Sequence, residues 1–160
     1  MTKQPEQLEF NNFGHTPKPT RGYLDGCFDL AHAGHYNAVR QASLLCDKLV
    51  FGLNSDAEII VNKGPPVLKG DERLKVVNAC KWTGEVYADT EYCVSEKLIE
   101  NFSCDFYLHG DDPCYNTEGV DMCQELAKIG KFKVFKRTSG VSTTGLTSKL
   151  LRLFDSNDVK

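Results

Sequence analysis

The chain has 160 residues, of which 41% are hydrophobic and 26% charged, with a formal net charge of -3 at pH 7 and an isoelectric point of about 5.8. This length accommodates one domain with a substantial core, and the mildly acidic charge argues against a general nucleic-acid-binding surface. No apolar run reaches the roughly 18 residues needed to span a membrane, so no integral membrane segment is expected.

The seven cysteines are scattered along the chain without a CxxC pair. Cys114 and Cys123 share one loop-to-helix stretch, but the overall pattern indicates neither a zinc site nor a disulfide framework. Residues 1–7 lack the apolar core of a secretion signal. We therefore expect no protein-bound metal site and a reduced, cytoplasmic location.

The first 19 residues are polar and carry Pro5, Pro17 and Pro19. This composition is typical of a loosely ordered leader. We expect one domain over residues 20–154 and a short C-terminal tail over residues 155–160.

Beyond the leader, short β-branched or aromatic runs alternate with longer stretches of 3.6-residue periodicity. Strands are predicted at 21–25, 48–53, 85–88, 105–109 and 132–136, and helices at 33–45, 71–80, 94–101, 120–129 and 143–154. This alternation predicts an α/β fold, a Rossmann-like, mostly parallel sheet of about five strands with helices on both faces. Ligands then bind at the carboxyl ends of the strands.

The first candidate motif, His32-Ala33-Gly34-His35, opens the helix predicted after the first strand. At i and i+3 the two imidazoles should share one helix face, and the N–H groups of the first turn attract anions. Gly34 would let a phosphate approach the backbone. Two unrelated surface or core histidines are the alternative, which the pairing and the flanking Gly26 and Gly34 disfavour. The motif predicts a phosphate-handling site.

A second candidate, Lys63-Gly64-Pro65-Pro66, follows the second predicted strand. A flexible loop carrying one lysine can close over a polyphosphate and screen its charge. An ordinary solvated lysine is the alternative, and the sequence leaves both open.

A third candidate, His109-Gly110-Asp111-Asp112-Pro113, follows the fourth predicted strand. The two carboxylates could accept hydrogen bonds from a base or ribose, cap a turn, or hold Mg²⁺. An Asx turn before Pro113 explains the same residues equally well.

The fourth candidate runs from Lys136 to Thr144, between the last strand and the last helix. Ser142 or Thr143 is predicted as the helix N-cap, which makes this helix start a second anion site, and Arg137 offers a planar fork matched to phosphate oxygens. A plain cap explains the hydroxyls but not the Lys136-Arg137 pair. Two helix starts could thus hold one polyphosphate from two sides.

These motifs, HxGH at residues 32–35 and RTxGxSTT at residues 137–144, resemble the signature of the cytidylyltransferase family. The resemblance extends over about residues 21–151 and implies the HxGH nucleotidyltransferase fold. HxGH alone would also admit adenylyltransferases, and the later motif narrows the nucleotide to CTP. Within the family, four stretches are most similar to the members that act on phosphoethanolamine: 23–29, 63–67, 81–86 and 109–112.

The resemblance implies transfer of CMP from CTP to phosphoethanolamine, giving CDP-ethanolamine and pyrophosphate for phosphatidylethanolamine biosynthesis. The acceptor phosphate would attack in line, without a covalent intermediate, and Mg²⁺ is expected to be carried mainly by the CTP phosphates. Residues 81–86 match the segment through which family members form homodimers. The alternatives are phosphocholine or glycerol 3-phosphate as acceptor, or a catalytically silent CTP-binding domain of a two-domain enzyme.

Roles are carried over by resemblance, position by position. The catalytic residues would be His32, His35, Lys63 and Arg137. The residues that bind CTP would be Cys27, Phe28, His32, His35, Gly110, Asp111, Lys136, Arg137, Thr138, Val141, Ser142 and Thr143. The residues that bind the acceptor would be Asp29, Lys63, Tyr92 and Tyr115.

The chain departs from the family pattern at a few positions. Tyr92 stands where the choline enzymes carry a tryptophan, and Cys123 replaces a shared tyrosine, so a thinner aromatic cage favours a primary ammonium. Gly145 replaces an aspartate of the last helix, which costs about 0.3–1 kcal/mol of helix-dipole stabilisation. Gly84 replaces an acidic residue in the segment linked to dimer formation. The resemblance covers one catalytic domain, as in an excised domain or a naturally short enzyme.

Overall fold

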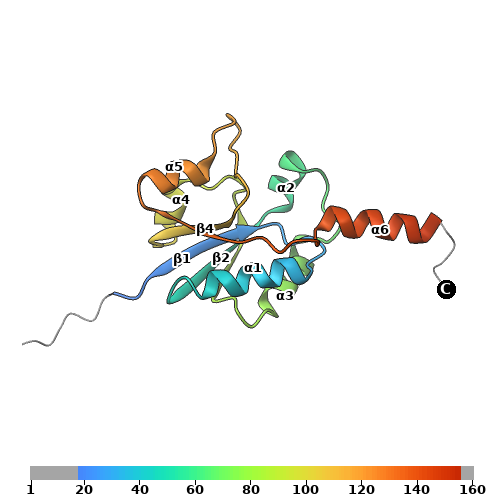
Figure 1. Cartoon of the computed structure of the whole chain (residues 1–160), viewed down its shortest axis with the longest axis horizontal. Coiled ribbons are helices and arrows are strands. Elements are labelled where there is room, and N and C mark those ends of the chain that lie inside the picture. Colours follow the sequence, from blue (N-terminus) through green and yellow to red (C-terminus); the bar gives the residue numbers. More distant parts are fainter. Residues whose placement is uncertain (1–17, 156–160) are drawn as a thin grey trace, which may run out of the picture.

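A computed structural model describes residues 18–155, so the predictions for residues 1–17 and 156–160 lie outside the described part (Figure 1). The fold is α/β, as predicted. In chain order the elements are β1 (Arg21–Gly26), α1 (Ala33–Ser43), β2 (Lys48–Asn54), α2 (Asp56–Asn62), α3 (Gly70–Asn78), β3 (Glu85–Thr90), α4 (Glu96–Asn101), β4 (Phe106–Gly110), α5 (Met122–Lys128), β5 (Phe132–Phe135) and α6 (Thr143–Asp155).

The strands form one parallel sheet in the order β3-β2-β1-β4-β5. The chain builds outward from β1 through β2 to β3, and then crosses back to add β4 and β5 on the other side of β1. The switch point therefore lies between β1 and β4. In open α/β sheets this is where ligands bind, beyond the carboxyl ends of the strands.

Alternate strand residues supply two cores, one on each face of the sheet. Leu24 and Leu108 pack with α1 and α3, while their neighbours Tyr23 and Tyr107 pack with α4 and α5. Figure 1 shows the same layering, with α1 and α3 on one side of the sheet and α4 and α5 on the other. Burial on both faces explains why the central strands are almost continuously apolar.

Two helices begin later than predicted, because a capping residue precedes the first helical residue in each. The helix predicted from residue 94 begins at Glu96, because Ser95 is its N-cap and accepts the Leu98 N–H at 3.1 Å. The helix predicted from residue 120 begins at Met122, because Asp121 caps it through the Cys123 N–H at 3.1 Å.

One helix was missed altogether. α2 lies in the connection after β2, for which no helix was predicted, and it ends just before the predicted loop at residues 63–66. Its signal was present in the sequence, because Ser55 accepts the Glu58 N–H at 3.1 Å and Asp56 and Glu58 lie in the first turn. Such residues favour a helix start, but seven residues are too few for a clear periodicity.

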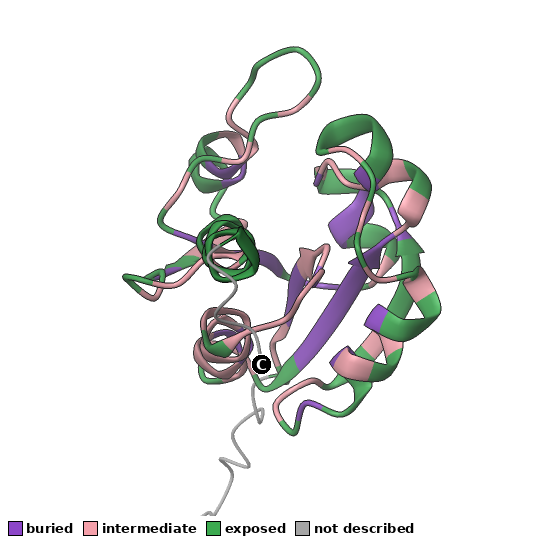
Figure 2. Cartoon of the chain, turned by 90° about the vertical axis from the view of Figure 1, so that its right-hand side faces the viewer, coloured by how far each residue is buried: buried purple, intermediate pink, exposed green. Residues whose placement is uncertain are grey.

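Helix α6 differs from the others. It projects away from the sheet (Figure 1), and in Figure 2, which looks along it, it is almost entirely exposed. None of its residues is buried. Among residues 18–155, no helix has the length and apolar character needed to cross a membrane.

The unusual Gly84 has a packing reason. A Cβ atom at this position would collide with the carbonyl oxygen of Leu49 on β2. Any larger residue would therefore force β3 away from its neighbour, because backbone atoms cannot yield as a flexible side chain can.

Candidate active site

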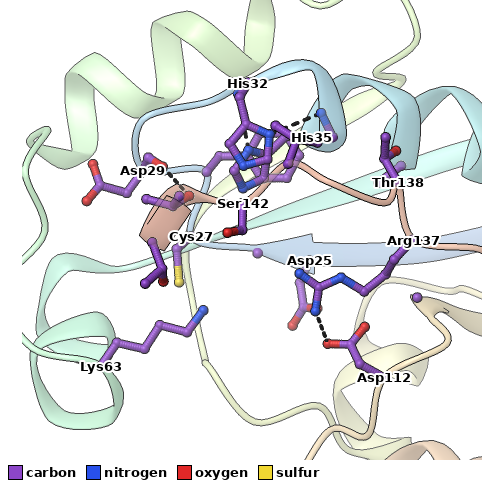
Figure 3. A pocket seen from close by; sticks show the side chains of 18 of the residues that line it. Asp25, Cys27, Asp29, His32, His35, Lys63, Asp112, Arg137, Thr138 and Ser142 are labelled. Carbon is purple, nitrogen blue, oxygen red and sulfur yellow. Dashed lines mark hydrogen bonds and ion pairs between the residues drawn. The ribbon is translucent and has the colours of Figure 1, made fainter. Parts of the chain in front are cut away.

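A cavity of about 510 Å³ opens at the carboxyl ends of β1 and β4, between the starts of α1 and α6 (Figure 3). Every predicted site residue lines it except Asp111, Tyr92 and Tyr115. Residues far apart in the sequence thus converge at the switch point of the sheet. The lining residues that were predicted are Cys27, Phe28, Asp29, His32, His35, Lys63, Gly110, Lys136, Arg137, Thr138, Val141, Ser142 and Thr143.

The two histidines cap α1 reciprocally. His32 is the N-cap, with extended backbone (φ -138°, ψ 178°), and its Nδ1 accepts the Gly34 N–H at 3.0 Å. His35, in the first turn, accepts the His32 N–H on its own Nδ1 at 3.2 Å. The two rings share one side of the helix start, as the i and i+3 spacing predicted, although His32 itself is the cap and not part of the helix. The rings nevertheless lie together, with their centroids 4.0 Å apart.

This capping leaves one nitrogen of each ring for a ligand. An imidazole that accepts on Nδ1 while neutral carries its proton on Nε2. Burial lowers the pKa of His35 to about 4, helped by repulsion from His32 and nearby cations, and burial also lowers the pKa of His32. Both rings are therefore neutral Nε2–H donors near pH 7. They suit hydrogen bonding to phosphate better than proton transfer.

Phe28 holds the His35 ring from behind. The two ring centroids are 4.8 Å apart, and Phe28 itself packs edge-on against Phe51 at 4.7 Å. Phe28 takes a positive φ of 49° in the turn after β1, a backbone conformation that is uncommon outside glycine. The chain thus turns sharply at Phe28, and this turn fixes the His35 ring.

Gly34 also has a packing role at the start of α1. A Cβ atom there would lie 2.8 Å from His32 Cε1 and 3.0 Å from Val141 Cγ1. The missing side chain makes room for the capping imidazole and for the 136–144 segment. Because the Gly34 N–H is already bonded to His32, the imidazoles replace this amide as donors at the helix start.

Lys63 is the C-cap residue of α2 and extends into the cavity toward Cys27 (Figure 3). Its Nζ lies 5.5 Å from the centroid of the Tyr92 ring. Burial opposes the charged form, but the Cys27 thiol and the Tyr92 phenol raise the pKa of the ammonium above its usual value. Tyr92 thus reaches the cavity through Lys63 rather than directly.

Asp29 ties three parts of the site together. Its carboxylate oxygens accept the N–H groups of Val67 at 2.7 Å and Leu68 at 2.9 Å. Its carbonyl oxygen accepts the Thr143 hydroxyl at 3.4 Å. The carboxylate predicted to face an ammonium group is instead engaged by the loop after Lys63.

Asp111 and Asp112 hold Arg137. The Arg137 N–H donates to Asp111 Oδ1 at 3.0 Å, and its NH1 group pairs with Asp112 Oδ2 at 2.8 Å (Figure 3). The hydrogen bond from the Arg137 amide lowers the pKa of the Asp111 carboxyl. These carboxylates therefore position the neighbouring Arg137 segment, a role that was not among those predicted for them.

The 136–144 segment is fixed at both ends. Asn37 on α1 donates to the Thr138 hydroxyl at 2.9 Å, and Gln41 donates to the Lys136 carbonyl at 2.9 Å. Ser142 accepts the Gly145 N–H at 3.0 Å, which identifies Ser142 rather than Thr143 as the N-cap of α6. The start of α6 therefore faces the start of α1 across the cavity.

Tyr115 does not reach the cavity. It is 58% exposed and lies in the loop between β4 and α5, where it pairs with Asp121. The structure gives no support to its predicted contact with the acceptor.

Asp25 lines the cavity at the end of β1 but was not among the predicted site residues. Its Oδ1 accepts the Tyr107 hydroxyl at 2.7 Å, and burial raises the pKa of the carboxyl to about 6. An aspartate directly before glycine at a strand end was the available signal. Among residues 18–155, Asp25 has no ion-pair partner, so it contributes an unpaired carboxyl group to the cavity.

Arg73 is a second residue that was missed. This fully buried α3 side chain donates to the Cys27 carbonyl at 2.6 Å, the Asn54 carbonyl at 2.9 Å and Asp56 Oδ1 at 2.6 Å. It joins the turn after β1 to the start of α2. An arginine in a short amphipathic helix normally indicates a solvent-facing position. The burial of Arg73 could therefore not be predicted from the sequence.

Metal ligands do not gather in the described part of the chain. Among residues 18–155, no group of three or more histidine, cysteine, aspartate or glutamate side chains is arranged to hold a metal ion.

Comparison with known proteins identifies the family. The family model for cytidylyltransferase-like proteins matches residues 23–149. An ethanolamine-phosphate cytidylyltransferase from Dictyostelium discoideum is 49% identical over 134 residues, covering 84% of this chain and 37% of the relative. One from Arabidopsis thaliana is 48% identical over 138 residues, covering 84% and 33%. The chain thus spans about a third of the length of these curated relatives.

A solved structure supports the fold alone. The lipopolysaccharide core biosynthesis protein from Thermoplasma volcanium aligns with a TM-score of 0.60 at 20% identity. The alignment covers 76% of this chain and 98% of that one.

Proposed function

This chain belongs to the cytidylyltransferase-like family, and from that premise we propose that it transfers CMP from CTP to phosphoethanolamine, releasing CDP-ethanolamine and pyrophosphate. The observation that carries the proposal is the meeting of two helix starts, Lys63 and Arg137 around one cavity. Four phosphate-handling features in one place exceed what a single anion needs. They match a polyphosphate that meets a second phosphate.

The reaction asks for alignment and charge stabilisation rather than for a nucleophilic side chain. The Nε2–H groups of His32 and His35 would donate to the α-phosphoryl oxygens, whose charge grows in the transition state. Lys63 would lie between the two substrates and reduce the repulsion between their phosphates. The Cys27 thiol is no nucleophile, because burial raises its pKa.

The start of α6, the second helix start at the cavity, would bind the leaving pyrophosphate. Arg137 and the Ser142 and Thr143 hydroxyls would hold the β- and γ-phosphates. Arg137 must then leave Asp112, and exposed ion pairs of this kind are worth only about 0–1 kcal/mol. Phosphate oxygens, which carry more charge and accept two hydrogen bonds from one guanidinium, can displace the carboxylate.

The cytidine would lie along the 136–141 segment and the end of β4. Backbone and side-chain groups of Gly110, Asp111, Lys136, Thr138 and Val141 are assigned to it by resemblance. Asp111 contributes by fixing the Arg137 backbone, which aligns this segment.

Mg²⁺ is expected to arrive with CTP. Both Asp29 oxygens accept backbone N–H groups, and Asp112 is paired with Arg137. Because these carboxylates already have partners, they fit a hydrated Mg²⁺ ion that is bound through the nucleotide phosphates better than an ion enclosed by protein ligands. The ion would neutralise phosphate charge, and the protein residues would fix the phosphate positions.

Asp25 is our preferred recognition group for the ammonium end of the acceptor. It is a carboxylate inside the cavity, anchored by Tyr107 and not paired with a cation. A primary ammonium can donate hydrogen bonds to it, which a quaternary ammonium cannot. Tyr92, which lies against Lys63, would add one aromatic face.

We also propose a homodimer formed through residues 81–86 and a cytoplasmic location. The dimer rests on the family resemblance of that segment. The reduced compartment rests on the free state of all seven cysteines.

A single assay tests the function. Pyrophosphate release is measured with CTP, Mg²⁺ and, in turn, phosphoethanolamine, phosphocholine or glycerol 3-phosphate, and the highest kcat/KM is expected with phosphoethanolamine. Asp25→Asn should raise KM for phosphoethanolamine more than KM for CTP. Preference for another acceptor would overturn the substrate assignment, and CTP binding without release from any acceptor would leave a silent binding domain.

A further inference from the structure

Two cysteines are held side by side next to the cavity. Cys114 lies in the loop after β4, and Cys123 lies in the first turn of α5. Their backbone N–H groups donate to the same atom, Asp121 Oδ1, at 3.3 and 3.1 Å. The Met122 N–H also donates to the Cys114 carbonyl at 2.8 Å. These bonds close the base of the loop and bring the two residues together.

The side chains meet as well. Both belong to the core on the α4–α5 face, where Cys123 is buried and Cys114 is partly buried. A hydrogen bond between the two thiols lowers the pKa of Cys114, and the same bond, together with burial, raises that of Cys123. The pair is therefore asymmetric, because the thiol of the partly buried Cys114 ionises more easily than that of the buried Cys123 beside it.

We propose that Cys114 and Cys123 form a redox-sensitive disulfide site that reacts with hydroperoxides. Cysteines whose backbone N–H groups share one carboxylate acceptor and whose thiols interact need little backbone movement to bond. A thiol that ionises readily and lies next to a resolving cysteine is the arrangement of redox-sensing cysteines in reducing compartments.

The chemistry balances with a hydroperoxide as the two-electron oxidant. The Cys114 thiolate attacks the terminal peroxide oxygen, the O–O bond breaks, and a sulfenic acid forms as water or an alcohol leaves. The Cys123 sulfur then attacks the Cys114 sulfur, the S–O bond breaks, and the hydroxyl leaves as a second molecule of water. The two thiols lose two electrons and two protons, and a thiol reductant reverses the step.

The site is connected to the cavity through Tyr107. The Tyr107 hydroxyl donates to Asp25 Oδ1 at 2.7 Å, and Tyr107 also influences the pKa of the neighbouring Cys114 thiol. Cys114 is also two residues from Asp112, which pairs with Arg137. A disulfide would remove the thiol from this network and pin the loop. We expect weaker acceptor binding in the oxidised protein, a consequence that rests on the proposed function.

The test oxidises the full chain with hydrogen peroxide, blocks the remaining thiols, and maps the peptides by mass spectrometry without reduction. The expected product is one peptide linked through Cys114 and Cys123, lighter by two hydrogen atoms and restored by dithiothreitol. Cys114→Ser and Cys123→Ser should lose this product. Cys93→Ser is the matched control and should keep it, since Cys93 lies near Cys114 but outside the pair.

A Cys93–Cys114 link would overturn the proposal. So would oxidation of single cysteines to sulfinic acid without a linked peptide. Acceptor KM is then compared between reduced and oxidised protein, with an increase of several-fold expected and an unchanged value refuting the link to Asp25. If no acceptor is used even by the reduced protein, the proposed function fails, whereas the peptide map still decides the disulfide.

Discussion

The two helix starts that face each other across the cavity are built in opposite ways. α1 begins with two neutral imidazoles, of which the His35 ring packs on Phe28, and it buries Val39 and Ala42 against the sheet. α6 begins with hydroxyls beside an exposed arginine and buries no residue at all. α6 is anchored where it starts, through the Ser142 cap and the bond from Thr143 to Asp29.

This difference suggests a division of labour. The reacting phosphorus must be held within a fraction of an ångström, which a packed and capped helix start can provide. The leaving pyrophosphate must be gripped and then released, which suits a helix with few other attachments. We therefore expect substitutions at the start of α1 to impair the chemical step and those at the start of α6 to weaken CTP binding.

The largest effect is expected from His32. His32→Ala removes both a phosphate donor and the N-cap of α1, so the rate of cytidylyl transfer should fall by at least about 100-fold, the scale for one preorganised donor. Stopped-flow or single-turnover measurement of the chemical step checks this.

His32→Asn separates the two losses. Asparagine caps helices well, so this variant should keep the stability of the wild type and still lose most of the rate. If His32→Asn recovered near-normal turnover, capping rather than phosphate contact would be the role of His32.

The next effect concerns how firmly each helix is attached. Val39→Ala in α1 removes two buried methyl groups and should lower the free energy of unfolding by about 2 kcal/mol. Leu150→Ala in α6, where the side chain is 60% exposed, should change it by less than about 0.5 kcal/mol. Urea denaturation compares them, and an equal loss in both would contradict the picture of a loosely attached α6.

The pH dependence of stability tests the neutral state of the α1 start. Folding lowers the pKa of His35 from 6.5 to about 4 but raises that of Asp25 from 3.8 to about 6. Between pH 4 and 6 the unfolded chain binds the extra proton at His35, and the folded chain binds it at Asp25. Their contributions to the slope therefore oppose each other, each by up to about 1.4 kcal/mol per pH unit.

Removing either group leaves the effect of the other on the pH dependence of stability unopposed. Asp25→Asn should lose stability more steeply than the wild type as pH falls from 6 to 4, and His35→Asn should lose it less steeply. Denaturant midpoints measured over this range decide the point. All other carboxylates contribute alike to both variants, so parallel curves for the two variants would show that both shifts are absent.

The smallest effect is expected at Ser142. Ser142→Ala removes the N-cap of α6 and should cost about 1 kcal/mol locally, seen as a few-fold increase in KM for CTP with kcat nearly unchanged. Ser142→Asp keeps a cap but places a negative charge beside the phosphates, so it should bind CTP less well than Ser142→Ala. A selective fall in kcat would contradict the assignment of α6 to binding.

The sequence was sufficient for the architecture and for most of the cavity wall. Strand and helix periods are strong over the sheet, and the residues of HxGH and RTxGxSTT needed no tertiary information to be placed at helix starts. α2 escaped because its seven residues span barely two turns, too few for a periodic signal.

The functions of individual side chains were harder to predict, since they depend on contacts between distant segments. Asp29 lies in the motif loop, but its partners Val67 and Leu68 come from a connection nearly forty residues later. Arg73 is buried because three oxygens, from the turn after β1, from β2 and from α2, converge on it. Spacing along the chain does not encode such convergence.

The switch point also divides the sheet mechanically. Residues Arg21 to Gly26 all pair with β2, whereas the register between β1 and β4 joins Gly22 and Tyr23 to Phe106 and Tyr107. Because fewer residues pair between β1 and β4 than between β1 and β2, we expect the sheet to open locally most easily between β1 and β4. The cavity lies above this pairing, and its lining includes Lys63, which follows β2 and α2, and Arg137, which follows β5. A bound polyphosphate would contact residues that follow both halves of the sheet. The substrate itself would therefore make the domain more rigid.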